Sequence, residues 1–409
     1  MNFGVLFLGA AIAADSWPEF RGPTGQGIVR EGRLPTEWSP TKNVAWKVTI
    51  PGAGWSSPVI AAGRVYLTTA VAAEKNGADE QSLRALCLDS STGHVLWDIE
   101  VFRQNGRQVP RIHPKNSHAS PTALVHGGHL YVHFGHQGTA CLDLAGKILW
   151  RNTSLYYQPV HGNGGSPIIV GDKLVFSCDG GDQAFIVALS CSTGEVLWKT
   201  ERSVNAERRF SFSTPLLITV NGRPQIVSPG SNMVGAYDPD AGREIWRVEY
   251  DGYSVIPRPV YGHGLVFVCT GFNNPTLLAI RPDGEGDVTR SHVAWKTRRA
   301  APLTPSALLV GDELYLVSDN GVASCLDAQS GRVHWQQRIE GNYSASPIYG
   351  DGKVYSQSEQ GTAVVMKAAK RYQLLATNSL GERTLASFAA ADGALFIRTE
   401  KHLYRIGSP

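Results

Sequence analysis

The 409-residue chain lacks the patterns that indicate packed helices, membrane spans or nucleic-acid binding. No segment repeats its apolar residues with a helical period, and Met is scarce (3) while Gly is abundant (44), which favours short strands joined by tight turns. After residues 3–13, no apolar run is long enough to span a membrane. The net charge is only +3, with Lys and Arg interleaved among Asp and Glu, so we expect no nucleic-acid partner and no transmembrane segment.

Motifs of common enzyme classes are also missing. The sequence contains no G-x-S-x-G, no H-E-x-x-H, no P-loop and no G-x-G-x-x-G between a strand and a helix. It has 6 cysteines but no C-x-x-C and no two adjacent cysteines. These absences argue against the corresponding hydrolase, protease and nucleotide-binding sites, and against zinc-ribbon and thioredoxin-type sites.

The N-terminus has the layout of a secretory signal peptide. Residues 3–13 are apolar and end in a small-residue site, Ala11-Ile12-Ala13, so we predict a signal peptide over 1–14 and export to the periplasm or the medium. Two alternatives are a misassigned start codon and a buried first strand. The predicted organisation continues with an N-terminal arm over 15–42 and a repeat domain over 43–409.

A repeat of about 40–50 residues runs through most of the chain. Its first half reads small-Ser-Pro, an apolar strand, a Gly turn and a second strand, as in GGSPIIVGDKLVFS (164–177). Its second half reads strand, turn and strand ending in Trp, as in FIVALSCSTGEVLW (185–198). The terminal tryptophans are Trp97, Trp150, Trp198, Trp246, Trp295 and Trp335. Two hairpins per unit at this period predict an all-β, eight-bladed β-propeller of four-stranded antiparallel blades.

The ends of the chain predict how the ring closes. The last repeat stops after KHLYRIGS (401–408) and lacks its outer strand, whereas NVAWKV (43–48) places Trp46 at the repeat position without a preceding hairpin. We therefore expect the N-terminal strand to complete the last blade. Such closure removes the open sheet edges that would otherwise pair with other chains.

The Trp-ending unit resembles the pyrroloquinoline-quinone (PQQ) repeat, which quinoprotein dehydrogenases share with non-enzymatic propellers of the BamB outer-membrane assembly type. WPEFRGPTGQG (17–27), HFGHQGTACLD (133–143) and PVHGNGGSP (159–167) are similar to a large group of exported bacterial PQQ-like propellers. The resemblance covers about residues 17–407 and implies the fold. It does not specify the function, because one fold hosts many functions.

The cysteines argue against both disulfides and a quinoprotein alcohol dehydrogenase. Cys87, Cys141 and Cys325 occupy the same repeat position, and blade packing holds equivalent positions too far apart for a disulfide; the one pairing that stays open is Cys178 with Cys191. We expect them to fill space between blades. Quinoprotein alcohol dehydrogenases carry two adjacent cysteines against the cofactor, and this sequence has none.

We place the candidate site on the face that carries the long connections between the second and third strands of a blade and between successive blades, hereafter the loop face. The opposite face, with the short turns, is the turn face. Function commonly resides in variable loops on a rigid scaffold. The ligand-binding candidates there are Trp55, His118, His136, His161, Asp179, Arg209, Asn232, Arg258, Asn320 and Tyr343.

Each group has a functional and a structural interpretation. His118, His136 and His161 could form a metal or acid–base cluster, but hydrogen bonding within the loops explains them better. Arg209 and Arg258 could bind a carboxylate or phosphate, or pair with acids of the rim. Trp55 could stack on a ligand. The arm residues Trp17 and Phe20 are expected to fix the arm to the body, or alternatively to cap the channel.

Three functions follow. The preferred hypothesis is a non-catalytic, monomeric scaffold without cofactor that binds a protein or peptide in the cell envelope, as the BamB-type resemblance implies. The second is an oxidoreductase with PQQ and calcium, for which Asp179, Asn232 and Arg258 would have to converge. The third is a carbohydrate-binding propeller with exposed loop aromatics, for which the candidates are Tyr156, Tyr157 and Phe272.

Overall fold

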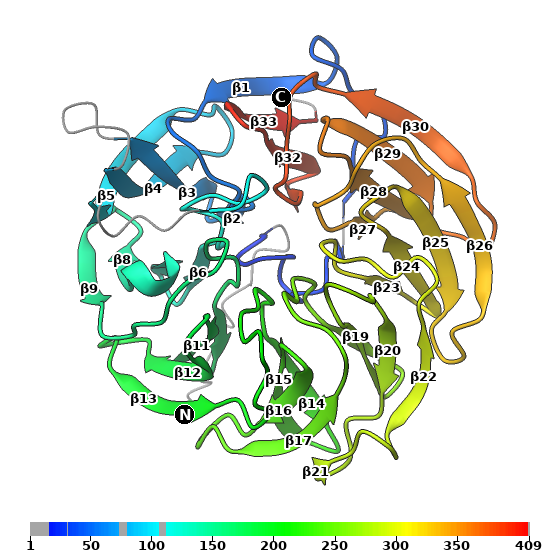
Figure 1. Ribbon diagram of the computed structural model, residues 1–409. Helices are drawn as coiled ribbons and strands as arrows, with labels where there is room; N and C mark the ends of the chain where they lie inside the picture. Colours follow the sequence, from blue (N-terminus) through cyan, green and yellow to red (C-terminus); the bar gives the residue numbers. More distant parts are fainter. Residues whose placement is uncertain (1–15, 31, 73–79, 106–111, 408–409) are drawn as a thin grey trace, which may run out of the picture.

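The computed structural model describes residues 16–30, 32–72, 80–105 and 112–407, and it shows eight sheets arranged as blades around one axis (Figure 1). The predicted all-β, eight-bladed propeller is confirmed. The predicted signal peptide lies outside the described residues. In the described part of the chain, the helical content is one short 3₁₀ turn, η1 (Gly135–Gln137), and no helix could cross a membrane.

From the axis outward, the strands are, for blade 1, β2 (Val59–Ala61), β3 (Arg64–Ala72), β4 (Gln81–Asp89) and β5 (Val95–Gln104); for blade 2, β6 (Leu124–His126), β7 (His129–His133), β8 (Thr139–Asp143) and β9 (Ile148–Asn152); for blade 3, β10 (Ile168–Val170), β11 (Lys173–Asp179), β12 (Ala184–Ser190) and β13 (Val196–Glu201); and for blade 4, β14 (Leu216–Val220), β15 (Arg223–Gly230), β16 (Met233–Tyr237) and β17 (Glu244–Glu249), with β21 (Gly286–Asp287) added at its edge.

The remaining strands are, for blade 5, β18 (Val260–Gly262), β19 (Leu265–Cys269), β20 (Leu277–Ile280) and β22 (Val293–Thr297); for blade 6, β23 (Leu308–Val310), β24 (Glu313–Val317), β25 (Val322–Asp327) and β26 (Val333–Arg338); for blade 7, β27 (Ile348–Gly350), β28 (Lys353–Gln357), β29 (Thr362–Lys367) and β30 (Leu374–Ser379); and for blade 8, β31 (Ala389–Ala391), β32 (Ala394–Arg398), β33 (His402–Ile406) and β1 (Val44–Thr49).

The ring closes as predicted. β1 pairs antiparallel with β33, with Thr49 opposite His402 and Lys47 opposite Tyr404. β1 is therefore the outer strand of the last blade, and its pairing with β33 closes the ring.

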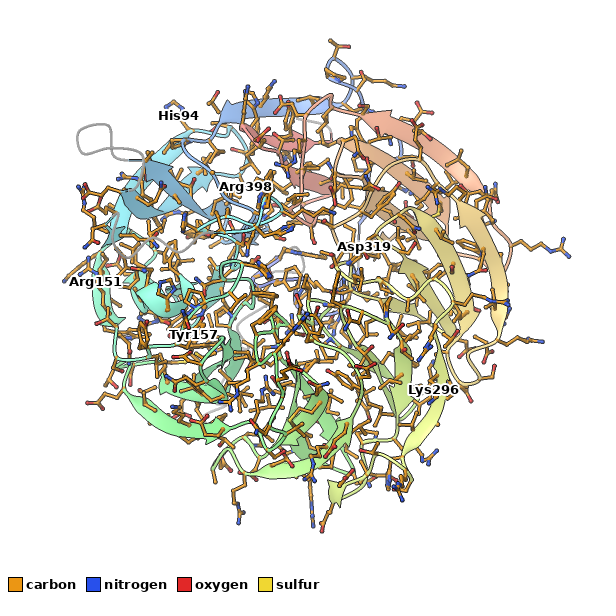
Figure 2. All side chains as sticks on the ribbon, viewed as in Figure 1. His94, Arg151, Tyr157, Lys296, Asp319 and Arg398 are labelled. Carbon is orange, nitrogen blue, oxygen red and sulfur yellow. The ribbon has the colours of Figure 1, made fainter. Side chains whose placement is uncertain are left out.

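Burial changes with distance from the axis. The middle strands are buried on both faces, as in β12, because the neighbouring blades cover them. The outer strands expose alternate residues, as in β9 and β22, and Figure 2 shows Arg151 and Lys296 of these strands at the rim.

In six of the eight blades, the repeat tryptophan joins the blade to the next one. The indole Nε1 of Trp150 donates to the backbone oxygen of Cys191 in the following blade at 2.9 Å, and Trp198 makes the same bond to Pro239 at 3.1 Å. The turn glycine of the next blade faces the ring: a Cβ on Gly194 would lie 2.5 Å from the Trp150 ring, and its φ of +75° favours glycine. One interface thus explains both the Trp and the Gly of the repeat.

Blade 4 departs from this pattern. Trp246 donates to the Oε1 atom of Gln225 in its own blade, and Gln225 donates in turn to the Pro282 carbonyl of blade 5 at 3.3 Å. The longer turn around residues 282–289 displaces the usual acceptor, and an amide side chain bridges the gap.

The small-Ser-Pro element forms a belt around the axis. The backbone N–H of a belt residue donates to the side-chain hydroxyl of the equivalent residue in the next blade. Thr122 donates in this way to Ser166 at 2.9 Å, and Ser166 donates to Thr214 at 3.0 Å. The belt positions are Ser57, Thr122, Ser166, Thr214, Arg258, Ser306, Ser346 and Ser387. Arg258 is the exception, with a guanidinium where the other blades have a hydroxyl.

All six cysteines are free, and five of them are buried. Cys87, Cys141 and Cys325 each lie opposite a repeat Trp in the ladder, which confirms their equivalence.

Candidate functional site

The N-terminal arm crosses the centre of the ring at the turn face (Figure 1). Trp17 exchanges two backbone hydrogen bonds with Ile60 of blade 1, and Tyr349 of blade 7 bonds with Gly27 and Val29. Trp17 is fully buried, so its predicted role in fixing the arm is confirmed. The arm also covers the axis, which was the alternative interpretation.

The arm binds Arg258. The guanidinium donates to the backbone oxygen of Phe20 at 2.5 Å and lies 3.4 Å from the Glu19 carboxylate. Burial raises the pKa of Glu19, although Arg258 opposes the shift. Arg258 therefore belongs to the contact between arm and ring, not to the loop face where the sequence analysis placed it.

On the loop face, the connection between blades 1 and 2 contacts blade 7 and two neighbouring connections. Lys115 forms an ion pair with Glu359 of blade 7 at 2.6 Å, and Asn116 donates to the His161 carbonyl at 2.9 Å. Arg383, from the connection between blades 7 and 8, donates to the Pro114 carbonyl at 3.0 Å. This connection thus links blades that are not neighbours in the ring.

The three candidate histidines do not converge as one group. His118 and His136 interact electrostatically, and burial lowers the pKa of both, to about 4 for His136, where His118 adds to the shift. His161 instead contacts His113, with ring centroids 5.7 Å apart. No group of three or more His, Cys, Asp or Glu residues in the described ranges is placed to hold a metal ion.

Asp179 and Tyr343 are interior structural residues. Asp179 forms a buried ion pair with Arg202 at 2.9 Å, and Arg202 also donates to Ser228 of blade 4. Burial raises the pKa of Asp179, while Arg202 opposes the shift. Tyr343 is fully buried and donates to the Glu340 carbonyl. Both side chains are therefore bonded within the protein.

The other candidates lie in loops. The Asn232 side chain donates to the Tyr250 carbonyl from a backbone φ of +61°, and Asn320 accepts a bond from Ser318. The Trp55 ring is half-buried, with the Arg383 guanidinium 5.4 Å from its centroid. Trp55 thus already stacks with a cation of this chain.

An aromatic row missed by the sequence analysis crosses the loop face. His113, His161, Phe210, Tyr253 and Phe272 contact one another in succession, with centroid separations of 5.7, 5.4, 5.7 and 5.6 Å and interplanar angles of 81°, 83°, 79° and 62°. The sequence did contain a signal for this row, because an aromatic or imidazole side chain precedes the innermost strand in three consecutive blades: His161, Phe210 and Tyr253. Phe272 is 51% exposed at the end of the row.

Two arginines border the aromatic row. Arg208 lies over the Tyr253 ring at 4.6 Å and bonds to its hydroxyl, while Arg209 donates to the Asp182 carbonyl and to the Asn205 side chain. The hydrogen bonds of both guanidinium groups within the described part of the chain go to neutral oxygens. Of the other predicted aromatics, Tyr156 is 65% exposed, whereas Tyr157 is buried.

The residues proposed for PQQ and calcium do not fit that cofactor pair. Asp179 is engaged by Arg202, the Asn232 amide donates to the Tyr250 carbonyl, and Arg258 binds the arm. Calcium prefers several converging oxygen ligands, and these side chains do not converge.

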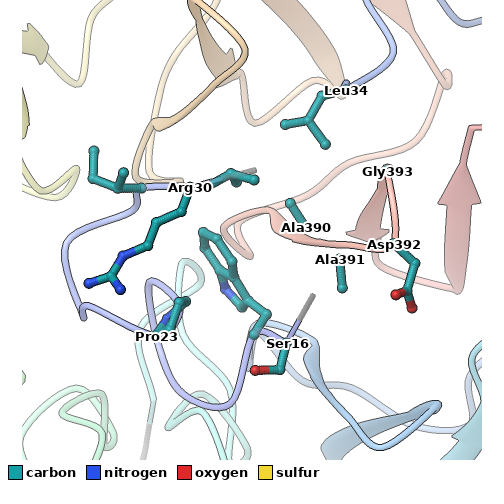
Figure 3. A pocket seen from close by; sticks show the side chains of 11 residues that line it. Ser16, Pro23, Arg30, Leu34, Ala390, Ala391, Asp392 and Gly393 are labelled. Carbon is teal, nitrogen blue, oxygen red and sulfur yellow. The ribbon is translucent and has the colours of Figure 1, made fainter. Parts of the chain in front are cut away.

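A small cavity of about 40 Å³ lies between the arm and blade 8 (Figure 3). Leu34, Ala390 and Asp392 are among the residues that line it. Its volume is about that of one or two water molecules, which is far below that of sites for metabolites.

Comparison with known proteins identifies relatives. The family model described as "Outer membrane protein assembly factor BamB" matches residues 28–177, 84–251 and 230–401. Curated proteins of that name from Shewanella oneidensis and Yersinia pestis are 22% and 24% identical over 69% and 47% of this chain, and the matches span 71% and 51% of those proteins.

Solved structures show the same fold at low identity. BamB from Moraxella catarrhalis has a TM-score of 0.62 at 10% identity, covering 89% of this chain and 97% of that one. A europium-containing methanol dehydrogenase scores 0.63 at 10% identity, with 94% and 89% covered. The quinohemoprotein alcohol dehydrogenase ADHIIG from Pseudomonas putida HK5 scores 0.64 at 10% identity, with 97% and 81% covered.

Proposed function

Because the chain belongs to the family of the outer membrane protein assembly factor BamB, we propose that it is a non-catalytic propeller that binds a protein or peptide in the bacterial cell envelope. The observation that carries this proposal is the aromatic row on the loop face, which ends in the exposed Phe272. Aromatic side chains and arginines are enriched among the residues that dominate the binding energy of protein interfaces. The aromatic rings bury a large rigid area with little loss of entropy.

The composition of this surface indicates the kind of segment it would bind. The rings offer apolar contact, and Arg208 and Arg209 offer charge that is not neutralised by a carboxylate in the bonds described above. A segment with an apolar side chain between acidic residues would complement both features. The charge would mainly speed association and select among partners.

Site-specific photo-crosslinking tests the proposal. A photoreactive amino acid replaces Phe272 in one variant and Leu374 in a control, because their exposures match at 51% and 50% and Leu374 lies on the outer strand β30. In the envelope of the bacterium that makes the protein, position 272 is expected to yield a discrete crosslinked protein that position 374 does not. Phe210→Ala with Tyr253→Ala should abolish this product. Equal crosslinking at both positions would contradict the proposal.

Calorimetry with PQQ and Ca²⁺ distinguishes the non-catalytic scaffold from the enzymatic alternative. We expect no saturable heat at tens of micromolar, and tight stoichiometric binding would refute the non-catalytic assignment. Retention of the protein on a glycan column, lost in Tyr156→Ala and Phe272→Ala, would instead favour carbohydrate binding.

A further inference from the structure

Two exposed histidines from different connections meet on the loop face. His113 lies in the connection between blades 1 and 2, and His161 lies in the connection between blades 2 and 3. Their ring centroids are 5.7 Å apart, with an interplanar angle of 81°. Both residues are exposed, so a solute can reach the two rings directly from the solvent.

Backbone contacts hold this pair together. The backbone N–H of His113 donates to the His161 carbonyl at 3.2 Å, and the side chain of Asn116 donates to the same oxygen at 2.9 Å. Ile112 forms a parallel β-bridge with His161, whose backbone φ is +64°. Positive φ is uncommon outside glycine and persists where the surroundings impose it. The two backbones are therefore fixed side by side, while each exposed ring can still turn about its broad χ2 torsion.

The ring nitrogens of the pair are open to a ligand. Among the described residues, no hydrogen bond involves a ring nitrogen of His161, and His113 uses only Nδ1, which accepts the backbone N–H of Lys115 at 3.1 Å. Burial lowers the pKa of His161, and the nearby His113 adds to this shift, so the His161 ring is neutral at neutral pH. A neutral imidazole is the form that binds a metal ion.

We propose that His113 and His161 together bind a divalent transition-metal ion that prefers imidazole ligands, Cu²⁺ or Zn²⁺, with water in the remaining positions. A coordinated ring nitrogen lies about 2.0–2.1 Å from such an ion, so two rings that share it have centroids roughly 5–6 Å apart. The observed separation of 5.7 Å lies in this range. Coordination through Nε2 of His113 moves the ring proton to Nδ1 by exchange with solvent, and water replaces the exposed bond from Lys115. The site goes beyond the proposed function, because it needs no protein partner.

Calorimetry of the wild-type protein with Cu²⁺ tests the site in solution. We expect one saturable site at the pair, weaker binding of Zn²⁺ and no binding of Ca²⁺, because nitrogen ligands favour Cu²⁺ whereas Ca²⁺ prefers oxygen. His113→Asn and His161→Asn should each weaken Cu²⁺ binding by about 100-fold, because a chelated ion gains its second ligand intramolecularly. Asn tolerates positive φ, so the backbone at position 161 is preserved in this variant.

His126 and His129 supply a matched control. These residues lie opposite each other across the hairpin of β6 and β7, but no ring contact joins them in the described part of the chain. His126→Asn should therefore leave the Cu²⁺ affinity unchanged. Loss of the site in this control, or unchanged affinity in both His113→Asn and His161→Asn, would overturn the assignment. Binding only at millimolar Cu²⁺ would show an adventitious ion only and would also overturn it.

A crystal soaked in Cu²⁺ and measured at the copper absorption edge gives an independent readout. The expected result is an anomalous peak about 2.0–2.1 Å from one nitrogen of each ring of the pair. A peak on one of the two rings alone, or peaks at other histidines only, would refute chelation by His113 and His161. Neither result bears on whether the aromatic row binds a protein, because photo-crosslinking at Phe272 tests that surface without added metal.

Discussion

Replacing Trp198 by Ala removes a side chain that joins blade 3 to blade 4. Trp198 is 8% exposed, its indole N–H bonds to the Pro239 carbonyl at 3.1 Å, and its ring faces Gly242, where a Cβ would lie 2.5 Å from the ring. Truncating a buried aromatic side chain costs about 3–5 kcal/mol through lost burial and the cavity left behind. We therefore expect Trp198→Ala to lower the free energy of unfolding by that amount.

Urea denaturation followed by fluorescence and circular dichroism measures this loss. Trp198→Phe retains part of the packing but loses the hydrogen bond, so it should cost less, about 1–2 kcal/mol. The control Leu197→Ala, 48% exposed on the same strand, should change stability by less than about 0.5 kcal/mol. A loss below about 1 kcal/mol for Trp198→Ala would refute the view that the repeat tryptophan fastens neighbouring blades. Equal losses for the Ala and Phe variants would assign the effect to the hydrogen bond instead of the packing.

Three further predictions concern the turns, the ring closure and the loop face. Gly194→Ala should destabilise more than Gly171→Ala by about 1–3 kcal/mol in urea denaturation, because both have positive φ but only Gly194 faces a Trp ring. Burial raises the pKa of Glu382, but hydrogen bonds from neighbours including Lys47 of β1 outweigh burial and lower this pKa to about 2. The ionised carboxylate therefore stabilises the fold above pH 4.5, and this stabilisation is lost as the pH falls toward 2. Glu382→Gln should flatten the dependence of Tm on pH over that range. Lys115→Ala should speed hydrogen exchange in residues 112–118 without changing Tm by more than about 2 °C, because the Lys115 side chain is 43% exposed and Glu359 keeps its hydrogen bond from Ser344. Unchanged exchange would contradict the role of Lys115 in holding this segment.

The repeat determined the architecture without tertiary information. Hairpins that end in Trp at a regular period specify blades, and an outer strand missing at one end and present at the other specifies closure by β1. These inferences succeed because each blade is a local unit of hydrogen-bonded hairpins, and each contact between blades repeats the same residues. The equivalence of Cys87, Cys141 and Cys325 follows from the same regularity.

Only the tertiary structure decided which loop residues meet. The aromatic row brings together rings from loops spread over residues 113–272, and Lys115 pairs with Glu359, which lies far away in the sequence. Arg258 looked like a loop-face residue because its repeat position is ordinary, but its partner is the arm, far away in the sequence. Positions within a blade are set by local pairing, whereas the convergence of loops and arm depends on ring closure, which brings distant residues together without a periodic signal in the sequence.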